Sequence, residues 1–459
     1  MFLKATYTIG ERKRFAHKRE ALEPITSNSL IQGRRDLHPG FLLLGMTGGV
    51  AANLATVLLI GQSSEFVVKS GVVIMMIAAA FFIKPSFVPL KAFAILIPLG
   101  AFVLLALVSW AYNRNPAFGL LRWCLVAAYF WAVARISWQS PGKRDRTISM
   151  ILGLTLAGGI FTVYVYSSST IQTSFGLRSS VEFLHPNTQA FICAGTASMA
   201  AALFTLCRSV LFKCILSGIG LLSLWGLIIT ASRMPVVALL AGIAVLLTIR
   251  YGYPSPGRKP VLIVSQVLAF TVVYLTITSL FKDQFYEYMR YDNLEDGSGR
   301  LDTYLFVLNE MFNPPIMPLG LGPGAGAPYL LDQMNLSSAH NALLQAIVDL
   351  GPLGFLPFVW MLAVAGGKAF KAQNRFPLEI AFFSSMLVFA MVRSMGEQEL
   401  LGLGNSFDLT LPFVLSKLWQ SSCWHEPDRM QNPNRDLPES DPSAGNGFSW
   451  RTRRKQEIT

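Results

Sequence analysis

Long apolar stretches alternate with short polar breaks along the chain from residue 41 to residue 419. A helix that crosses about 30 Å of hydrocarbon needs roughly 20 apolar residues, and stretches of this length recur about twelve times. The pattern therefore predicts an all-α polytopic membrane protein. The predicted transmembrane helices are 41–61, 66–83, 92–112, 118–138, 148–166, 187–207, 214–230, 235–250, 260–281, 341–365, 376–394 and 401–419.

The overall composition agrees with this interpretation. Hydrophobic residues make up 52% of the chain, charged residues make up 14%, and the mean hydropathy is +0.45. Soluble domains carry about 25% charged residues. Two predicted spans are weaker than the others, because Lys69 lies in the second, and Asn405 and Asp408 lie in the last.

The basic residues fall mainly on one side of the predicted spans. If residues 1–40 are cytoplasmic, most of the 38 Lys and Arg residues lie in cytoplasmic segments, as the positive-inside rule requires. Both termini are therefore predicted to be cytoplasmic. The net charge of +12 then reflects membrane topology and needs no nucleic-acid partner. The basic residues left outside are Arg114, Arg178, Arg233, Lys282, Arg290 and Arg300.

The same pattern divides the chain into segments. Residues 1–40 form a basic cytoplasmic segment in which we expect no signal peptide, because no short apolar core precedes a small-residue cleavage site. Residues 41–281 hold transmembrane helices 1–9, residues 282–340 form one large extracytoplasmic loop, and residues 341–419 hold helices 10–12. Residues 420–459 are rich in Pro, Asn, Ser and charge, which predicts a disordered cytoplasmic tail.

The loop at 282–340 is far longer than the other connections, and such loops are usually functional or disordered. Its many aromatic and aliphatic residues argue against disorder. Apolar residues recur at helical spacing from Ser298 to the NPP sequence at 313–315. We expect an amphipathic helix that lies on the membrane or caps the bundle. Its predicted apolar face is Leu301, Tyr304, Leu305, Leu308, Met311 and Phe312.

The sequence GLGPGAG at 320–326 suggests a phosphate-binding loop at first sight. A P-loop continues with Lys and then Ser or Thr, and a dinucleotide-binding loop follows a strand. Neither condition holds here. A tight turn that brings the backbone close to a neighbour or a ligand is the simpler interpretation.

Arginines on the extracytoplasmic side are candidates for binding an anion. Arg233 stands at the start of a span, where it either faces a cavity or a partner or extends to the membrane interface. Arg178 and Arg300 lie in loops, where solvated charge is the ordinary explanation. Together these arginines would suit a diphosphate, because guanidinium groups pair bidentately with phosphate oxygens.

His340 and Asn341 stand where the long loop ends and the next span begins. A histidine at such a boundary is more often structural than catalytic. Imidazole nevertheless titrates near neutral pH and is suited to accept a proton from a hydroxyl group.

Other polar residues share the extracytoplasmic side. His185 and Asn187 flank Pro186 at the start of a span, where they are either part of a helix cap or contacts to a ligand. Glu397 and Glu399 offer carboxylates to sugar hydroxyls, or are solvated loop charges. HExxH, GxSxG and paired-cysteine motifs are absent from the sequence. If the chain is an enzyme, we therefore expect metal-independent chemistry with no cofactor.

The order of these motifs resembles the O-antigen ligase and polysaccharide polymerase superfamily of bacterial membrane proteins. The resemblance rests on HPN at 185–187, the Ser-Arg step at 232–233, the long outward loop, and HNxxL at 340–344 followed by GPLG at 351–354. One departure is Met-Pro after the Ser-Arg step, where the family favours a small residue.

The resemblance implies a GT-C-like bundle in the bacterial plasma (inner) membrane, with its active site on the extracytoplasmic face. Such enzymes transfer a glycan from undecaprenyl diphosphate to an acceptor hydroxyl without a metal ion. By motif, His340 matches the candidate base or acceptor-orienting group, and Arg178 and Arg233 match arginines near the diphosphate. Arg300 is a weaker correspondence. The expected acceptor-binding or supporting residues are Asn341, His185, Asn187, Glu397 and Glu399.

Three functions follow from this resemblance and from the span count. A polymerase passes the glycan to another lipid-linked repeat, and the HPN, HNxxL and GPLG motifs favour this function. A ligase passes it to the lipid A core. A solute transporter is the alternative from another class, but its polar residues would gather at the membrane midplane. Expected partners are the lipid-linked glycan donor, a glycan or lipid-linked acceptor and membrane lipid, with a flippase and a chain-length regulator as further candidates.

Overall fold

The computed structural model describes a helical bundle that carries one short hairpin. The described residues are 37–58, 62–83, 93–113, 117–138, 145–166, 170–173, 176–179, 186–207, 209–230, 232–252, 300–335, 339–373, 376–396 and 405–421. The predicted span at 260–281, most of the segment 1–40 and the tail after residue 421 lie outside these residues.

Every other predicted span coincides with a helix. These helices are α3 (Pro39–Leu58), α4 (Gln62–Phe82), α5 (Leu96–Asn113), α6 (Ala117–Ser137), α7 (Arg146–Tyr166), α8 (Pro186–Leu206), α9 (Val210–Ile229), α10 (Arg233–Gly252), α15 (Ala342–Ala372), α16 (Pro377–Ser394) and α17 (Ser406–Gln420).

Eight of the described helices are long and apolar enough to cross a membrane, namely α5, α6, α7, α8, α9, α10, α15 and α16. Shorter apolar windows lie in α3 and α4. Helix α17 has 15 residues. The chain is therefore an α-helical membrane protein, while the count of about twelve spans and the GT-C-like arrangement stay predictions.

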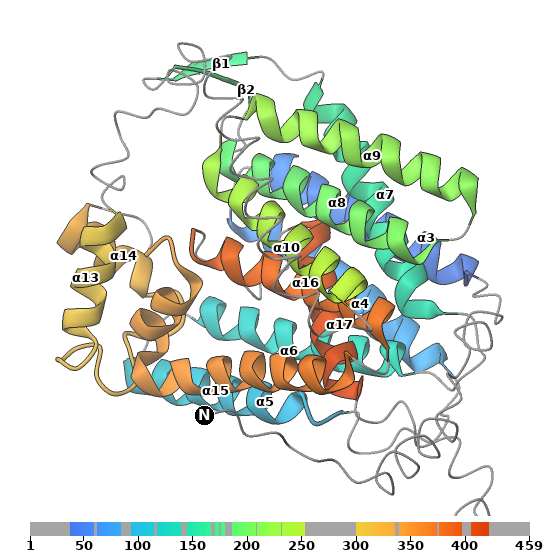
Figure 1. The fold of residues 1–459 in the computed structure, drawn as a ribbon. Helices are drawn as coiled ribbons and strands as arrows, with labels where there is room; N and C mark the ends of the chain where they lie inside the picture. Colours follow the sequence, from blue (N-terminus) through green and yellow to red (C-terminus); the bar gives the residue numbers. More distant parts are fainter. Residues whose placement is uncertain are drawn as a thin grey trace, which may run out of the picture.

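Helix α17 lies at the centre of the bundle (Figure 1), and all its residues except Lys417 are buried. It packs against α3, α6, α7, α8, α15 and α16. Helices α5 and α9 instead leave large apolar side chains exposed, among them Leu104, Leu221 and Trp225. Exposed apolar side chains on helices of this length suit contact with lipid.

Small residues let α3 and α7 pack closely. A Cβ atom on Gly45 would lie 2.3 Å from the Met150 carbonyl oxygen, and one on Gly153 would lie 2.2 Å from that of Leu42. Close backbone approach through small residues is a common way to pack helices in membranes. The backbone amide of His38, just before α3, also donates to Ser149 Oγ near the start of α7 (2.8 Å).

A short hairpin departs from the all-helical prediction. Strands β1 (Thr170–Thr173) and β2 (Gly176–Ser179) pair antiparallel, with Ile171 opposite Arg178. The β-branched residues of the sequence TIQT favour extended backbone. The hairpin lies between α7 and α8 at the edge of the molecule (Figure 1).

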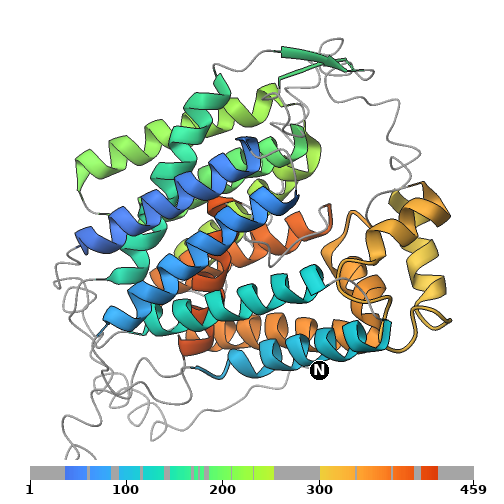
Figure 2. The ribbon, with the colours of Figure 1, turned by 180° about the vertical axis from the view of Figure 1, so that it is seen from behind.

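The described part of the predicted extracytoplasmic loop contains two helices, α13 (Arg300–Glu310) and α14 (Gly326–Met334). Both lie at one end of the bundle, beside the start of α15 (Figures 1 and 2). They share a small hydrophobic core with α15, here called the loop core. Its buried members are Val307, Ile316, Leu330, Ala339, Leu344, Ile347 and Val348.

The helix predicted between Ser298 and the NPP sequence appears as α13, with one side in the loop core and another side exposed. Thr303 and Val307 are fully buried, whereas Leu301 and Leu305 are 61% and 50% exposed. Helical spacing groups residues into faces without saying which face packs on the protein. The helix is apolar on both sides, and its Val307 side packs in the loop core.

Candidate functional site

The predicted site begins at the junction between the loop and α15. Asn341 caps the helix, because its Oδ1 accepts hydrogen bonds from the backbone amides of Leu343 (3.0 Å) and Leu344 (3.2 Å). His340 directly precedes this cap, is half-buried, and has a positive φ of 47°. Few non-glycine residues adopt this conformation. The cap and the left-handed turn together fix the orientation of the His340 backbone relative to α15.

Tyr304 of α13 contacts the same junction. Its hydroxyl lies 3.2 Å from the carbonyl oxygen of His340 and 2.6 Å from that of Met395, at the end of α16. A phenol has one proton to donate, so the shorter bond to Met395 dominates and the His340 contact shares or alternates with it. Tyr304 therefore joins three elements at one point.

Gln345 and Asp349 hold the loop against α15. Gln345 Oε1 accepts from the backbone amide of Ala339 (3.1 Å), next to His340. Asp349 Oδ1 accepts from the amide of Gly326 (2.9 Å) and from Gln345 Nε2 (3.3 Å). The sequence analysis did not single out either residue. Their spacing of four places them on one helix face and was the available signal.

The glycine-rich stretch 320–326 makes a tight turn against a kink in α15. Gly351 has φ 70° and ψ −179° inside the helix, and a Cβ atom there would lie 2.1 Å from the Pro318 carbonyl oxygen. The amides of Leu321 and Gly322 donate to the carbonyls of Val348 and Asp349 (2.9 and 2.8 Å). The prediction of a close backbone turn is confirmed.

The HPN and Ser-Arg motifs meet in space. Ser232 Oγ donates to Asn187 Oδ1 (3.0 Å), which joins the beginnings of α10 and α8. Arg233 is the first residue of α10 and is half-buried. Met234 follows, and a Cβ atom on Gly396 would lie 3.1 Å from its Cγ. Met234, which follows the Ser-Arg step, therefore lies beside the end of α16.

The end of α16 connects the two halves of the predicted site. A Cβ atom on Gly396 would meet the side chain of Met234, the residue after Arg233. The neighbouring Met395 accepts the bond from Tyr304, which also contacts His340. Residues from distant parts of the sequence thus converge at one end of the bundle.

The remaining predicted site residues are not placed in atomic detail. His185, Glu397 and Glu399 lie outside the described residues, directly before α8 and after Gly396. Arg178 lies in β2 and Arg300 begins α13, but the described structure does not include their side chains. Within the described part of the chain, no three His, Cys, Asp or Glu side chains lie close enough to hold a metal ion. Metal independence stays a prediction.

A buried ion pair near this end of the bundle was missed by the sequence analysis. Arg393 Nη1 of α16 bonds to Asp408 Oδ1 of α17, and both side chains are buried. Asn405 caps α17, and its Nδ2 also donates to Asp408 Oδ2 (2.8 Å). Asn53 of α3 accepts from the amide of Ser406 (2.9 Å). The signal was present, because a charge within a span almost always has a partner.

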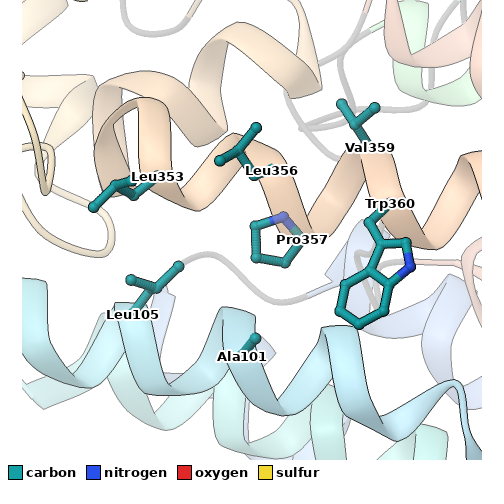
Figure 3. A pocket seen from close by; sticks show the side chains of 7 residues that line it. All are labelled: Ala101, Leu105, Leu353, Leu356, Pro357, Val359 and Trp360. Carbon is teal, nitrogen blue, oxygen red and sulfur yellow. The ribbon is translucent and has the colours of Figure 1, made fainter.

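An apolar groove of about 550 Å³ lies between α5 and α15 (Figure 3). It is lined by Ala101, Leu105, Leu353, Leu356, Pro357, Val359 and Trp360. Such a lining suits hydrocarbon and offers little to a sugar or a diphosphate. The lining of the groove therefore differs in chemistry from the polar junction at His340.

Comparison with known families agrees with this arrangement. The family model described as O-antigen ligase matches residues 218–359. The matched segment contains Arg233, Arg300, Tyr304 and His340. No curated protein matches the chain. Residues 218–359 are therefore similar to an O-antigen ligase domain, which agrees with the family resemblance of the motifs.

Proposed function

We propose that this chain is a polysaccharide polymerase of the bacterial inner membrane. It transfers a glycan from undecaprenyl diphosphate to a hydroxyl of another lipid-linked repeat unit, in exopolysaccharide or O-antigen synthesis. The observation that carries the proposal is the convergence of His340 and the Ser232–Arg233 step on the end of α16, through Tyr304 and Met234. A transferase needs its acceptor-activating group and its leaving-group site near each other.

In this proposal, the arginines bind the diphosphate of the glycan donor. Arg233 stands at the N-terminus of α10, where the helix dipole favours an anion. Arg178 and Arg300 are proposed to complete the diphosphate site. As the glycosidic bond breaks, its electron pair goes to the diphosphate oxygen, and guanidinium groups placed beforehand stabilise that charge.

The acceptor side is assigned to His340. The acceptor hydroxyl oxygen attacks the anomeric carbon from the side opposite the diphosphate, so the anomeric configuration inverts. The hydroxyl proton passes to the imidazole of His340, and undecaprenyl diphosphate leaves. Asn341 supports this step by capping α15 behind His340. His185, Asn187, Glu397 and Glu399 are proposed to contact or support the acceptor.

An O-antigen ligase is the second candidate, favoured by the description of the matched family model. A ligase would use the same donor chemistry and pass the glycan to lipid A core. The HPN motif with a later HNxxL and GPLG remains the reason to prefer a polymerase.

Reconstitution separates these functions. Purified protein in lipid nanodiscs is given a lipid-linked oligosaccharide repeat, with or without lipid A core, and products are separated by size and identified by mass. A polymerase yields lipid-linked chains of several repeats and free undecaprenyl diphosphate without the core. A ligase yields product only with the core.

Two controls complete this experiment. Repeating the reaction with a chelator tests metal independence, and the rate should not change. Arg233→Ala should raise the KM for donor and lower the rate, whereas Arg250→Ala, at the other end of α10, should leave both unchanged. No product under any condition, together with solute uptake into proteoliposomes, would establish the transporter instead.

A further inference from the structure

Several described contacts hold the loop that carries α13 and α14 against the bundle. Asn113 Nδ2 of α5 donates to the Gly320 carbonyl (3.1 Å), and Ser109 Oγ lies 3.5 Å from the Asp349 carbonyl oxygen. Both contacts secure the side near the α15 kink. On the side of His340, the bond from Tyr304 to Met395 joins α13 to the end of α16.

Tyr304 links α13 both to the end of α16 and to the backbone of His340. The residue is half-buried and packs against the loop core, so its ring moves with α13. Its hydroxyl lies within hydrogen-bond distance of the carbonyl oxygens of Met395 and His340, and its one proton is shared between them or alternates. Both partners are backbone carbonyl groups, so these hydrogen bonds do not depend on the side-chain conformations of Met395 and His340.

We infer that Tyr304 is a positioning residue that sets the place of His340 relative to the Arg233 side of the site. This inference rests on the proposed function. Tyr304 need not touch either substrate, because it acts by fixing the backbone from which the imidazole extends. A displacement of about 1 Å in a reacting group can cost about 100-fold in rate, so one hydrogen bond at this point has a large effect.

Tyr304→Phe tests the inference, because it removes the hydroxyl and keeps the ring in the loop core. Tyr329→Phe is the matched control. Tyr329 lies in α14 with its ring 6.2 Å from that of Phe306, packs against the same core, and takes no part in the Tyr304 bonds. Equal thermal unfolding of both variants and the wild type shows that the fold is retained.

Two measurements are made on the full-length proteins in nanodiscs. The first is transfer from a lipid-linked oligosaccharide, with kcat and KM for the donor. The second is the rate at which diethyl pyrocarbonate modifies His340, read by mass spectrometry of its peptide, with His38 at the start of α3 as internal reference. The second measurement needs no activity.

Tyr304→Phe should lower kcat by about tenfold or more and leave the donor KM within about twofold. Modification of His340 should become about two- to tenfold faster, the factor that the loss of one hydrogen bond gives, with no change at His38. Tyr329→Phe should match the wild type in both measurements.

Two results would overturn the inference. One is wild-type transfer by Tyr304→Phe. The other is slower transfer with unchanged modification of His340, which would mean that Tyr304 acts elsewhere. If the wild-type protein transfers no glycan, the proposed function fails, and the modification rates still decide whether Tyr304 holds His340.

Discussion

The hydroxyl of Ser232 donates a hydrogen bond to the side-chain oxygen of Asn187, 3.0 Å away. The two residues lie 45 positions apart; Ser232 directly precedes α10, and Asn187 is the second residue of α8. Ser232 precedes Arg233, and Asn187 ends the HPN motif. The bond therefore ties the segment of the predicted diphosphate-binding arginine to the HPN motif.

Ser232→Ala should weaken donor binding. Losing one hydrogen bond costs about 1 kcal/mol, which corresponds to about a fivefold rise in the donor KM. Titration of reconstituted protein with lipid-linked oligosaccharide measures this. Ser209→Ala is the control, because Ser209 precedes α9 and its side chain makes no capping bond. A donor KM in Ser232→Ala equal to that of Ser209→Ala would contradict the role of the Ser232–Asn187 bond.

Asn341 should act through its cap and not through its amide. Asn341→Asp keeps an oxygen that accepts from Leu343 and Leu344, so activity should stay within about threefold of the wild type. Asn341→Ala removes the cap and should cost about 1 kcal/mol of stability along with activity. Thermal unfolding and transfer rates distinguish them. Equal loss in both variants would indicate that the amide contacts substrate.

The Arg393–Asp408 pair should be essential for stability. Removing one partner leaves the other charge buried and unpaired, which costs about 3–5 kcal/mol. Asp408→Ala and Arg393→Met should each lower the unfolding temperature strongly, and the double variant Arg393→Met/Asp408→Leu should recover part of the loss. Fluorescence-monitored unfolding in detergent measures this coupling. Additive losses in the double variant would mean that the two charges do not depend on each other.

Gly351→Ala should disrupt the junction between α15 and the loop. The backbone there has a positive φ of 70°, and a Cβ atom would collide with the Pro318 carbonyl oxygen. Gly366→Ala in the same helix is the control, because a Cβ atom there meets nothing within 4 Å. Gly351→Ala should yield little folded protein by size-exclusion chromatography, and Gly366→Ala should match the wild type or exceed its stability. Equal yields would show that the kink tolerates a side chain.

The sequence predicted the helices well, because the width of the hydrocarbon layer imposes a length on every span. It also predicted the turn at 320–326 and the helix that became α13. It did not say which side of α13 packs on the protein, since periodicity groups residues into faces without naming their partners. Val307 packs in the loop core, while Leu301 and Leu305 stay exposed.

The site was predicted through its motifs but not through its connections. Ser232 and Asn187 belonged to motifs already noted, and their hydrogen bond follows only from the fold. Tyr304 bonds to backbone carbonyls 36 and 91 residues away. Every residue has a backbone carbonyl, so the residue types at those positions could not predict these contacts. Arg393 and Asp408 were recognisable as charges inside predicted spans, and their pairing needed the packing of α16 against α17.

The central claim is that His340 takes the acceptor proton during glycan transfer. Its most direct test is the single-turnover rate of transfer by His340→Ala in nanodiscs, with lipid-linked donor bound in advance. We predict a rate at least about 100-fold below that of the wild type, with donor affinity unchanged, because general-base catalysis contributes factors of this size. A wild-type rate in His340→Ala would contradict the claim and remove His340 from the chemistry.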